Sequence, residues 1–230
     1  EGLSPDVITF LCIVKACSNI GSLEMGEELY AKLRKQGMAG KDIVLRTALV
    51  DMYSNCGVLG RAHEIFDDTP IHNISLWTAL MSGYAQVGKV ERVFSLFNTM
   101  IKEEVSPDMV SFVVLLNACS HVGLVEAGKI AFNAMSTFYF ITPTMEHYTC
   151  MVDLFARAGQ FDKALGVIEK GGCSHHVPCW LSLLAACYKW EISELGRMVF
   201  EQLVCLDDRC SAAYVCMRNI SFASAMYVEG

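Results

Sequence analysis

The fold class that the sequence predicts is all-α: an α-solenoid of stacked helix-turn-helix repeats. Three observations predict it. Five similar segments end in glycine at intervals of 31 to 36 residues, an apolar stripe with helical spacing precedes each glycine, and a second such stripe follows it. One helical hairpin occupies about that length. The 53% hydrophobic and 19% charged content is too apolar for a disordered chain and suits helices that pack on every neighbour.

The first helix of each hairpin is predicted from the residues that precede each glycine. The five segments are Cys17–Gly21, Tyr53–Gly57, Tyr84–Gly88, Cys119–Gly123 and Phe155–Gly159. Residues eight, five, four and one before each glycine are apolar or small, as in Ile13, Ala16, Cys17 and Ile20, which is one face of an α-helix. The glycine then ends the helix, because it adopts the left-handed conformation without strain.

The second helix begins with an apolar residue two positions after each glycine: Leu23, Leu59, Val90, Val125 and Phe161. Small residues recur early in this helix and let two helices approach closely: Gly26, Ala62, Gly128 and Ala164. Pro107 and Pro143 fall where one hairpin should end and the next begin. Neither helix can bury its apolar face alone, so neighbouring hairpins must stack with their first helices along one concave side.

Composition excludes several classes of protein. The formal charge of −7 argues against a general binder of polyanions. Apolar runs such as Phe112–Leu116 are far shorter than the roughly 20 residues of a membrane span. Eleven cysteines without a hydrophobic signal segment indicate reduced thiols in an intracellular compartment. Because the chain opens at Glu1, we expect a piece of a longer protein, with any targeting segment outside it.

Four strings carry a resemblance to a known family: Ala48–Gly57, Trp77–Gln86, Leu116–Gly123 and Glu146–Leu154. They resemble the pentatricopeptide repeat (PPR) family in its plant-type variant, whose long, short and standard units alternate. Tetratricopeptide repeats fit less well, because their unit is a steady 34 residues or so. The resemblance implies a right-handed superhelix with units at 7–42 (long), 43–73 (short), 74–108 (standard), 109–144 (long) and 145–176 (short). Residues 1–6 resemble the tail of a preceding unit.

The pattern changes after the fifth unit. Trp180–Cys187, Glu194–Gly196 and Ala213–Val215 resemble the family's C-terminal E motif, so we predict an E-like motif over 177–215. Glu191 stands where the turn glycine is expected. Residues 216–230 depart from the family pattern and are predicted to be an irregular, degenerate or truncated end.

The resemblance implies binding of single-stranded RNA, one base per repeat, read by two side chains in each unit. One reader lies ten residues before the glycine and the other is the last residue of the unit. The pairs are Leu11 with Asp42, Thr47 with Asn73, Thr78 with Asp108, Val113 with Thr144, and Thr149 with His176. The long units have apolar first readers and should discriminate poorly, and Thr149 with His176 departs from the family code.

The family code reads Thr–Asn as adenine and Thr–Asp as guanine. This is chemically sensible, because a carboxylate only accepts hydrogen bonds and guanine offers N–H donors, whereas an amide both donates and accepts. Our hypothesis is that units 43–73 and 74–108 read consecutive A and G, 5′ to 3′ along the chain. Two informative bases supply roughly 2–6 kcal/mol of discrimination, too little to find one transcript without further repeats.

Two further positions in each unit face the RNA in this family. Three residues before each first reader, Ile8, Val44 and Val110 suit packing against a base plane, and Ser75 and Glu146 suit it less well. Two residues before each glycine, the family often carries a cation near the phosphates, and here only Arg157 is cationic.

Simpler interpretations compete with these assignments. A lone threonine on a helix is usually solvated, and aromatic residues at one register (Phe10, Trp77, Phe112 and Tyr148) are better explained as core than as stacking platforms. Cys17, Cys119 and Cys187 are expected to be buried, and Cys173–Cys179 matches no common zinc pattern. The chain has no Cys-x-x-Cys, so the zinc deaminase signature is absent. We therefore predict no catalytic residues, no metal and no cofactor.

The resemblance implies a non-catalytic RNA-binding protein of mitochondria or chloroplasts that recognises sites of C-to-U editing. A deaminase or another editing-complex protein would be recruited in trans through the E-like motif, and no membrane is involved. Two alternatives remain. One is a helical scaffold that binds protein, which the single cation favours, and the other is a factor for RNA splicing or stability.

Overall fold

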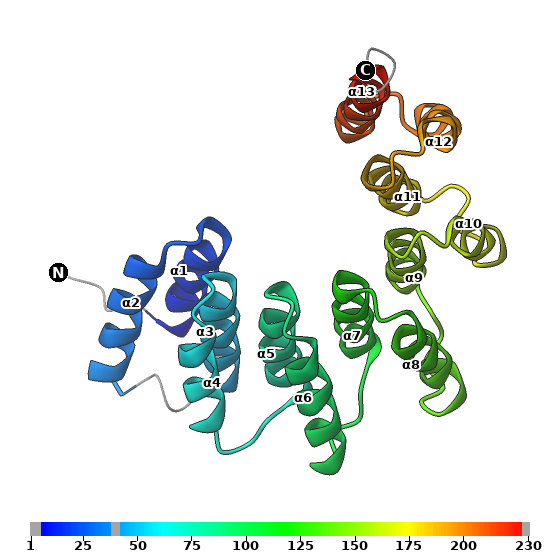
Figure 1. Ribbon diagram of the computed structural model, residues 1–230. Coiled ribbons are helices and arrows are strands. Elements are labelled where there is room, and N and C mark those ends of the chain that lie inside the picture. The colour runs from blue at the N-terminus through cyan, green and yellow to red at the C-terminus, as the bar shows by residue number, and fades with distance from the viewer. Residues whose placement is uncertain (1–5, 38–41, 227–230) are drawn as a thin grey trace. The chain divides into compact units, whose positions relative to one another are not determined.

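The computed structural model describes residues 6–37 and 42–226. Over these residues the chain forms thirteen α-helices and no strand, which confirms the all-α prediction (Figure 1). The helices fall into two compact units, residues 1–118 and 119–230, and the division lies inside the helix α7 (Met109–Val122). Most of the predicted tail at 1–6 and the last residues of the predicted irregular end lie outside the described ranges.

The first unit is a row of helical hairpins. Its helices are α1 (Val7–Ile20), α2 (Leu23–Lys35), α3 (Ile43–Asn55), α4 (Leu59–Asp67), α5 (Ile74–Gln86), α6 (Val90–Lys102) and the first part of α7. The odd-numbered helices pack side by side, α1 on α3 and α3 on α5, and each also packs on the helix that follows it (Figure 1). The residues that were predicted to read RNA therefore come from helices that are direct neighbours.

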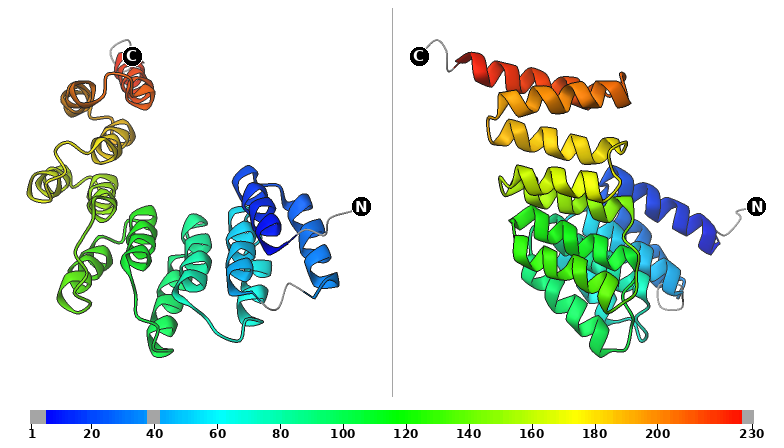
Figure 2. Two further views of the ribbon diagram at one scale, coloured as in Figure 1. Left: turned by 180° about the vertical axis from the view of Figure 1, so that it is seen from behind. Right: turned by 90° about the vertical axis from the view of Figure 1, so that its right-hand side faces the viewer.

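The second unit repeats the same arrangement. Its further helices are α8 (Val125–Thr137), α9 (Met145–Arg157), α10 (Phe161–Lys170), α11 (Val177–Lys189), α12 (Ser193–Leu206) and α13 (Ser211–Met226). The helices α9, α11 and α13 are successive neighbours in one row (Figure 2). The helix α13 runs through residue 215, so the predicted change to an irregular end at 216 falls in the middle of a regular helix.

The turns between paired helices are built as the sequence predicts. Gly21, Gly57, Gly88, Gly123 and Gly159 all have φ between 66° and 79°, which confirms that each glycine ends its helix in the left-handed region. Glu191 adopts the same conformation with φ 56° although it carries a side chain. The E-like region thus keeps the hairpin turn and accepts the strain of a non-glycine residue there.

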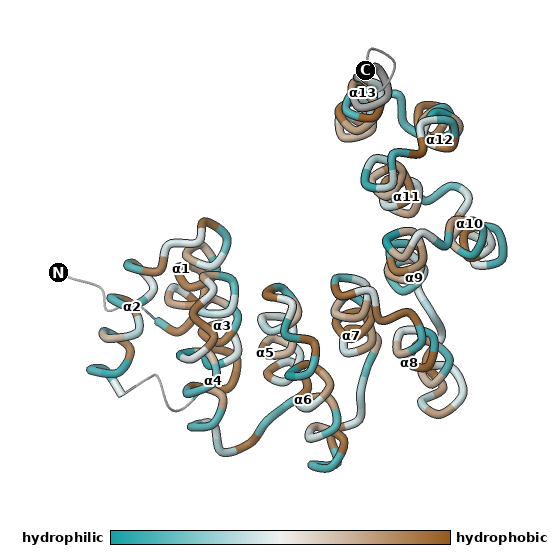
Figure 3. The backbone as a smooth tube through the Cα atoms, in the orientation of Figure 1, coloured by the Kyte–Doolittle hydropathy of each residue, from teal (hydrophilic) through white to brown (hydrophobic). Residues whose placement is uncertain are grey.

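Close helix approaches use the small residues. A Cβ on Gly26 would lie 2.6 Å from the Met52 Sδ atom, and one on Gly128 would collide with Leu154. The core is distributed along both rows, and Figure 3 shows hydrophobic residues recurring in the helices of both units. Three of the predicted core aromatic residues, Phe10, Trp77 and Phe112, and all three predicted core cysteines are at most 2% exposed. The fourth aromatic residue, Tyr148, is only partly buried.

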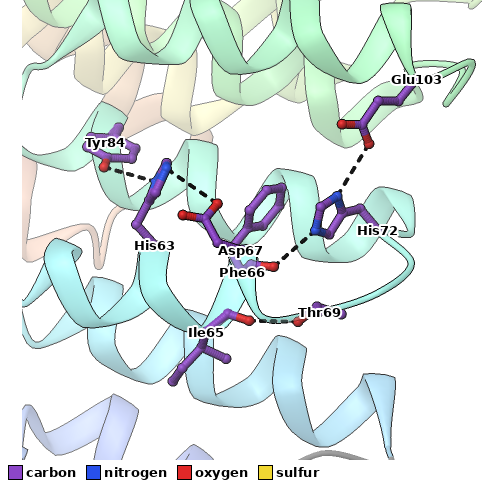
Figure 4. A network of polar contacts seen from close by, with 8 residues as sticks. All are labelled: His63, Ile65, Phe66, Asp67, Thr69, His72, Tyr84 and Glu103. Atoms are coloured by element: carbon purple, nitrogen blue, oxygen red, sulfur yellow. Dashed lines mark hydrogen bonds and ion pairs between the residues drawn. The ribbon is translucent and has the colours of Figure 1, made fainter.

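A polar network ties α4, α5 and α6 together on the side of the even-numbered helices (Figure 4). The Tyr84 hydroxyl lies 3.2 Å from His63 Nδ1, and His63 Nε2 lies 3.7 Å from the Asp67 carboxylate. His72 places Nε2 3.0 Å from the carbonyl oxygen of Phe66 and Nδ1 3.3 Å from the Glu103 carboxylate. These contacts add polar links between α4, the loop that follows it, α5 and the end of α6.

No disulfide bond joins any of the eleven cysteines, all of which lie in the described ranges. None of the helices that the structure describes has the length and apolar character needed to cross a membrane.

Candidate nucleic-acid interface

The second reader of each predicted pair immediately precedes a helix, and in the first three pairs its side chain caps the helix N-terminus. Asp42 Oδ1 accepts a hydrogen bond from the Val44 amide at 2.8 Å. Asn73 Oδ1 accepts one from Leu76 at 2.9 Å, and Asp108 Oδ1 one from Ser111 at 2.9 Å. Asp and Asn are among the best N-cap residues, so local helix chemistry explains why these residue types stand there.

Capping leaves one polar side-chain atom of Asn73 and one of Asp108 available. Asn73 uses Oδ1 for the cap, and its Nδ2 makes no hydrogen bond within the described part of the chain. Asp108 uses Oδ1 for both the amide and the hydroxyl of Ser111, and Oδ2 makes none there. The Asn73 side chain therefore presents a donor and the Asp108 side chain an acceptor.

The threonine readers share one conformation. The Oγ1 atoms of Thr47, Thr78 and Thr149 donate to the carbonyl oxygens four residues earlier, at 2.8, 3.0 and 2.8 Å. Each hydroxyl has its proton on the backbone and can accept a hydrogen bond from a base without losing that bond. Thr78 is only 8% exposed, so its hydroxyl is less accessible than the sequence suggested.

A groove with a volume of about 460 Å³ brings predicted readers of the first unit together. It lies along α1, α3 and α5 and is lined by Leu11, Lys15, Val44, Thr47, Ala48, Asp51, Asn73, Ser75 and Ala79. The two predicted readers of unit 43–73, Thr47 and Asn73, thus face one space. The apolar side chains of Leu11 and Val44 line the same space, which is the chemistry that a flat heteroaromatic base requires.

The predicted base-packing residues are exposed apolar side chains at one register. Ile8, Val44 and Val110 are 69%, 57% and 54% exposed. Ser75 and Glu146 at the same register are also exposed, and the Thr144 hydroxyl lowers the pKa of Glu146 by hydrogen bonding to it. Isolated exposed apolar residues are common, but exposure at the same register in three hairpins indicates a shared surface.

The fifth pair is also brought together, and it is joined to a thiol. Thr149 Oγ1 lies 3.3 Å from His176 Nδ1 and 3.3 Å from Cys179 Sγ.

Thr144, the second reader of the fourth pair, donates its backbone amide to His147 Nδ1 at 3.1 Å. Val113, the first reader of the same pair, is half-buried. Within the described ranges no group of three His, Cys, Asp or Glu side chains could hold a metal ion.

The predicted phosphate contact, Arg157, is held by a carboxylate. Arg157 Nε lies 2.7 Å from Asp153 Oδ2, which also accepts a hydrogen bond from the Ser120 hydroxyl at 2.5 Å. The ion pair offsets the attraction of Arg157 for a phosphate. Phosphate binding there requires the guanidinium to share or exchange its partner.

Three residues of this surface were missed from the sequence. Lys15 and Asp51 line the groove with Thr47 and share a register, six residues before Gly21 and Gly57. Lys189 Nζ lies 3.4 Å from the carbonyl oxygen of Arg157 and stands two residues before Glu191. Arg157 stands two residues before the turn residue Gly159, and Lys189 stands two residues before Glu191, which takes the place of the turn glycine. The same position counted in the last hairpin therefore predicts Lys189 from the sequence.

Comparisons with known proteins give one family. A PPR repeat family model matches residues 72–121, and a PPR repeat model matches 8–38 and 146–170. The pentatricopeptide repeat-containing protein At5g56310 of Arabidopsis thaliana is 36% identical over 96% of this chain and 41% of its own length. Two further Arabidopsis thaliana proteins of this name, At4g19191 (mitochondrial) and At1g08070 (chloroplastic), are 35% and 36% identical over 99% and 98% of the chain. The chain covers 35% and 30% of them.

Solved structures show the same fold at low identity. The pentatricopeptide repeat protein PPR10 from maize has a TM-score of 0.56 at 17% identity, covering all of this chain and 35% of that one. PPR10 in complex with an 18-nucleotide psaJ RNA element has a TM-score of 0.61 at 13% identity, covering 95% and 40%. The PPR domain of Arabidopsis thaliana protein-only RNase P 1 in complex with tRNA has a TM-score of 0.53 at 16% identity, covering 68% and 84%.

The chain spans about two fifths or less of the curated relatives it matches. Within that span, the family models, the relatives and the fold agree. This chain contains pentatricopeptide repeats, which the family models match at residues 8–38, 72–121 and 146–170.

Proposed function

We propose that the chain binds single-stranded RNA along its odd-numbered helices, with one base to a unit. Units 43–73 and 74–108 read adenine followed by guanine in the 5′ to 3′ direction. Two solved neighbours, PPR10 and the PPR domain of protein-only RNase P 1, are complexes with RNA, which supports RNA binding by the repeat array.

The groove that contains Thr47 and Asn73 is the observation that carries the proposal. Its polar groups are an accepting hydroxyl and a donating amide, and its walls are apolar. Adenine offers an amino donor and a ring-nitrogen acceptor on its Watson–Crick edge, which complement these two groups. Asp108 presents an acceptor instead, which complements the N–H groups of guanine.

The finer assignment is recognition of a C-to-U editing site in mitochondria or chloroplasts. In this proposal residues 177–215 lie next to the edited cytidine and recruit a deaminase or another editing-complex protein in trans. The mitochondrial and chloroplastic names of relatives support an organellar location. A role in RNA splicing or stability would use the same RNA contacts without the deaminase.

The experiment measures binding of the full chain to RNAs that differ only at the base facing unit 74–108. Wild-type protein should prefer G at this position, and Asp108→Asn should move the preference towards A. The matched control is Asp68→Asn, an exposed aspartate at the C-terminus of α4, which should leave the preference unchanged. Unchanged preference in Asp108→Asn would contradict the assignment of this reader.

A helical scaffold for a protein partner is the second candidate. The ion pair of Arg157 with Asp153 and the net charge of −7 favour it, because both weaken attraction to phosphates. Absence of binding by the full chain to any single-stranded RNA in the experiment above would leave this function.

A further inference from the structure

A second groove, with a volume of about 580 Å³, lies in the second unit. It runs between α8 and α10 over the surface of α9. Its floor is formed by Phe132, Tyr148, Met151 and Phe155, and its volume is within the range of roughly 300–1,000 Å³ that is typical of ligand sites. None of the residues assigned to RNA lines it.

The groove is open because its two walls do not meet. The helices α8 and α10 both pack on α9, but within the described chain their backbones do not come close to each other. Gly166 and Gly171 line the groove on the α10 side and place no side chain in it. A Cβ added to Gly166 would meet no atom within 4 Å. The partly exposed Tyr148, which its register had assigned to the core, belongs to this floor.

The rim carries positive charge. Lys129, Lys163 and Lys170 line the groove together with a single acidic residue, Asp162. Lys163 Nζ lies 6.0 Å from the centre of the Phe155 ring and donates to Gln160 Oε1 at 2.8 Å. Lys129 is paired with Glu126 at 3.0 Å, and both of these side chains are exposed. The groove therefore has a net positive lining although the chain as a whole has a net charge of −7.

The floor suits inserted side chains better than stacked bases. Phe155 is 6% exposed, and the partly buried rings of Phe132 and Tyr148 lie 5.6 Å apart with a tilt of 58°, so the floor is not one flat surface on which a base would stack. Thr149, the predicted reader on α9, contacts residues of α11 and the turn before it, away from this groove. A protein segment is therefore the occupant that the geometry favours.

We propose that this groove binds an acidic amphipathic helix of a partner protein. Apolar side chains of that helix fill the floor over Met151 and Phe155, and its Asp or Glu residues meet Lys129, Lys163 and Lys170. Helix-in-groove recognition uses apolar anchors at i, i+3, i+4 and i+7, and an open groove between two helices accommodates such a stripe. The site is independent of the proposed RNA contacts.

The test measures fluorescence anisotropy of the full chain with a labelled helical peptide of about 16 residues, bearing leucine and phenylalanine on one face and glutamate on the other. A peptide with lysine in place of glutamate is the charge control. Gly166→Leu should weaken binding by about tenfold or more, because the new side chain fills the groove. It should also fold, since leucine favours a helix more than glycine does.

The matched control is Gly60→Leu. Gly60 lies in α4 of the first unit, far along the chain from the groove. Among the described glycines with negative φ, Gly60 and Gly166 are the two whose added Cβ would meet no atom within 4 Å. The double variant Lys163→Glu with Lys170→Glu should reduce affinity for the acidic peptide and raise it for the basic one. Circular dichroism melting of each variant confirms folding.

Four results would overturn the proposal. One is no saturable binding of the acidic peptide, and another is equal binding of the acidic and basic peptides. The third is equal affinity of Gly166→Leu and wild type. The fourth is displacement of the bound peptide by single-stranded oligouridine, which would assign the groove to nucleic acid. None of these results bears on the base preference of Asp108, so the two proposals fail separately.

Discussion

At the scale of single residues, one position serves two purposes. Asp42, Asn73 and Asp108 each cap a helix with one side-chain oxygen. Helix capping accepts Asp and Asn about equally well, so it leaves the choice between them open. Base recognition does distinguish the two, because the atom left over is an acceptor in Asp and a donor in Asn. The same side chain can therefore hold the repeat together and specify the base.

Stability and base preference should separate at Asp108. Asp108→Ala removes the cap and should lower the free energy of unfolding by about 1 kcal/mol, whereas Asp108→Asn should change it by less than about 0.5 kcal/mol. Urea denaturation followed by circular dichroism measures both. A large loss of stability in Asp108→Asn would show that the carboxylate has a structural role beyond the cap.

Glu191 offers a stabilising substitution. Its φ of 56° strains any residue with a side chain, and Glu191→Gly should remove that strain. After the greater entropy of glycine in the unfolded chain is subtracted, we expect a gain of roughly 0.5–1 kcal/mol in the free energy of unfolding. Thermal denaturation measures it, with Glu201→Gly in the interior of α12 as a control that should destabilise.

Thiol reactivity should follow burial. Burial raises the pKa of Cys150 to about 12 and the pKa of Cys119 and Cys187 to about 11. A raised pKa lowers the thiolate fraction, so at pH 8 a group with a pKa of 11 is about one part in a thousand thiolate. In native protein a maleimide should label the exposed Cys12 and Cys205 first, as peptide mapping would show. Fast labelling of Cys150 would contradict its burial.

At the scale of helices, the stacking of the hairpins depends on how closely neighbouring odd-numbered helices approach each other. The helices α3 and α5 meet at Gly83, where an added Cβ would lie 2.5 Å from Ser54 Oγ and 2.8 Å from Leu59 Cδ2. Ser54 and Leu59 are themselves buried, so neither can move aside into solvent. The distance between these helices sets the spacing of Thr47 and Thr78, and in the proposed function it therefore sets the spacing of successive bases.

Gly83→Ala should therefore destabilise the first unit by about 1–3 kcal/mol through overpacking. Gly60→Ala is the control, because its Cβ would meet no atom within 4 Å, and it should change stability by less than about 0.5 kcal/mol. Chemical denaturation of the two variants measures the difference. Equal stabilities would mean that α3 and α5 adjust their separation freely.

At the scale of the whole molecule, charge limits how the chain can bind RNA. The net charge is −7, and the predicted path has few cations: Lys15 at the first groove, and Arg157 and Lys189 near the end of α9. Affinity should depend more on base contacts than on counterion release. For two phosphates neutralised, the slope of log K against log salt is roughly −1.4.

Lys15→Gln should make that slope shallower by roughly 0.7 and leave the base preference at the next two units unchanged. Binding titrations of the full chain over a series of salt concentrations measure both quantities. Lys32→Gln, an exposed lysine of α2 away from the groove, is the matched control. A change of base preference in Lys15→Gln would show that Lys15 contacts a base.

Local patterns were enough to predict the helices and turns. The i, i+3, i+4, i+7 stripe before Gly57 and the left-handed glycine depend only on residues within one hairpin, so the sequence contains them directly. The helices α1, α3, α5, α7, α9 and α11 each begin at the first residue of a predicted unit, while the division into long, short and standard units stays a proposal. The assignments of individual readers likewise stay proposals.

The sequence by itself determined the hairpins, their order and the residue types at each register, because helix periodicity and capping act over a few neighbouring residues. Only the tertiary structure decided which of those side chains share a space. Lys15 and Asp51 line the same groove as Thr47. Asp153 forms an ion pair with Arg157, and Tyr148 lines the groove between α8 and α10 instead of lying in the core. These relations depend on how closely separate helices approach, and that distance is set by the packing of side chains more than 20 residues apart in the chain.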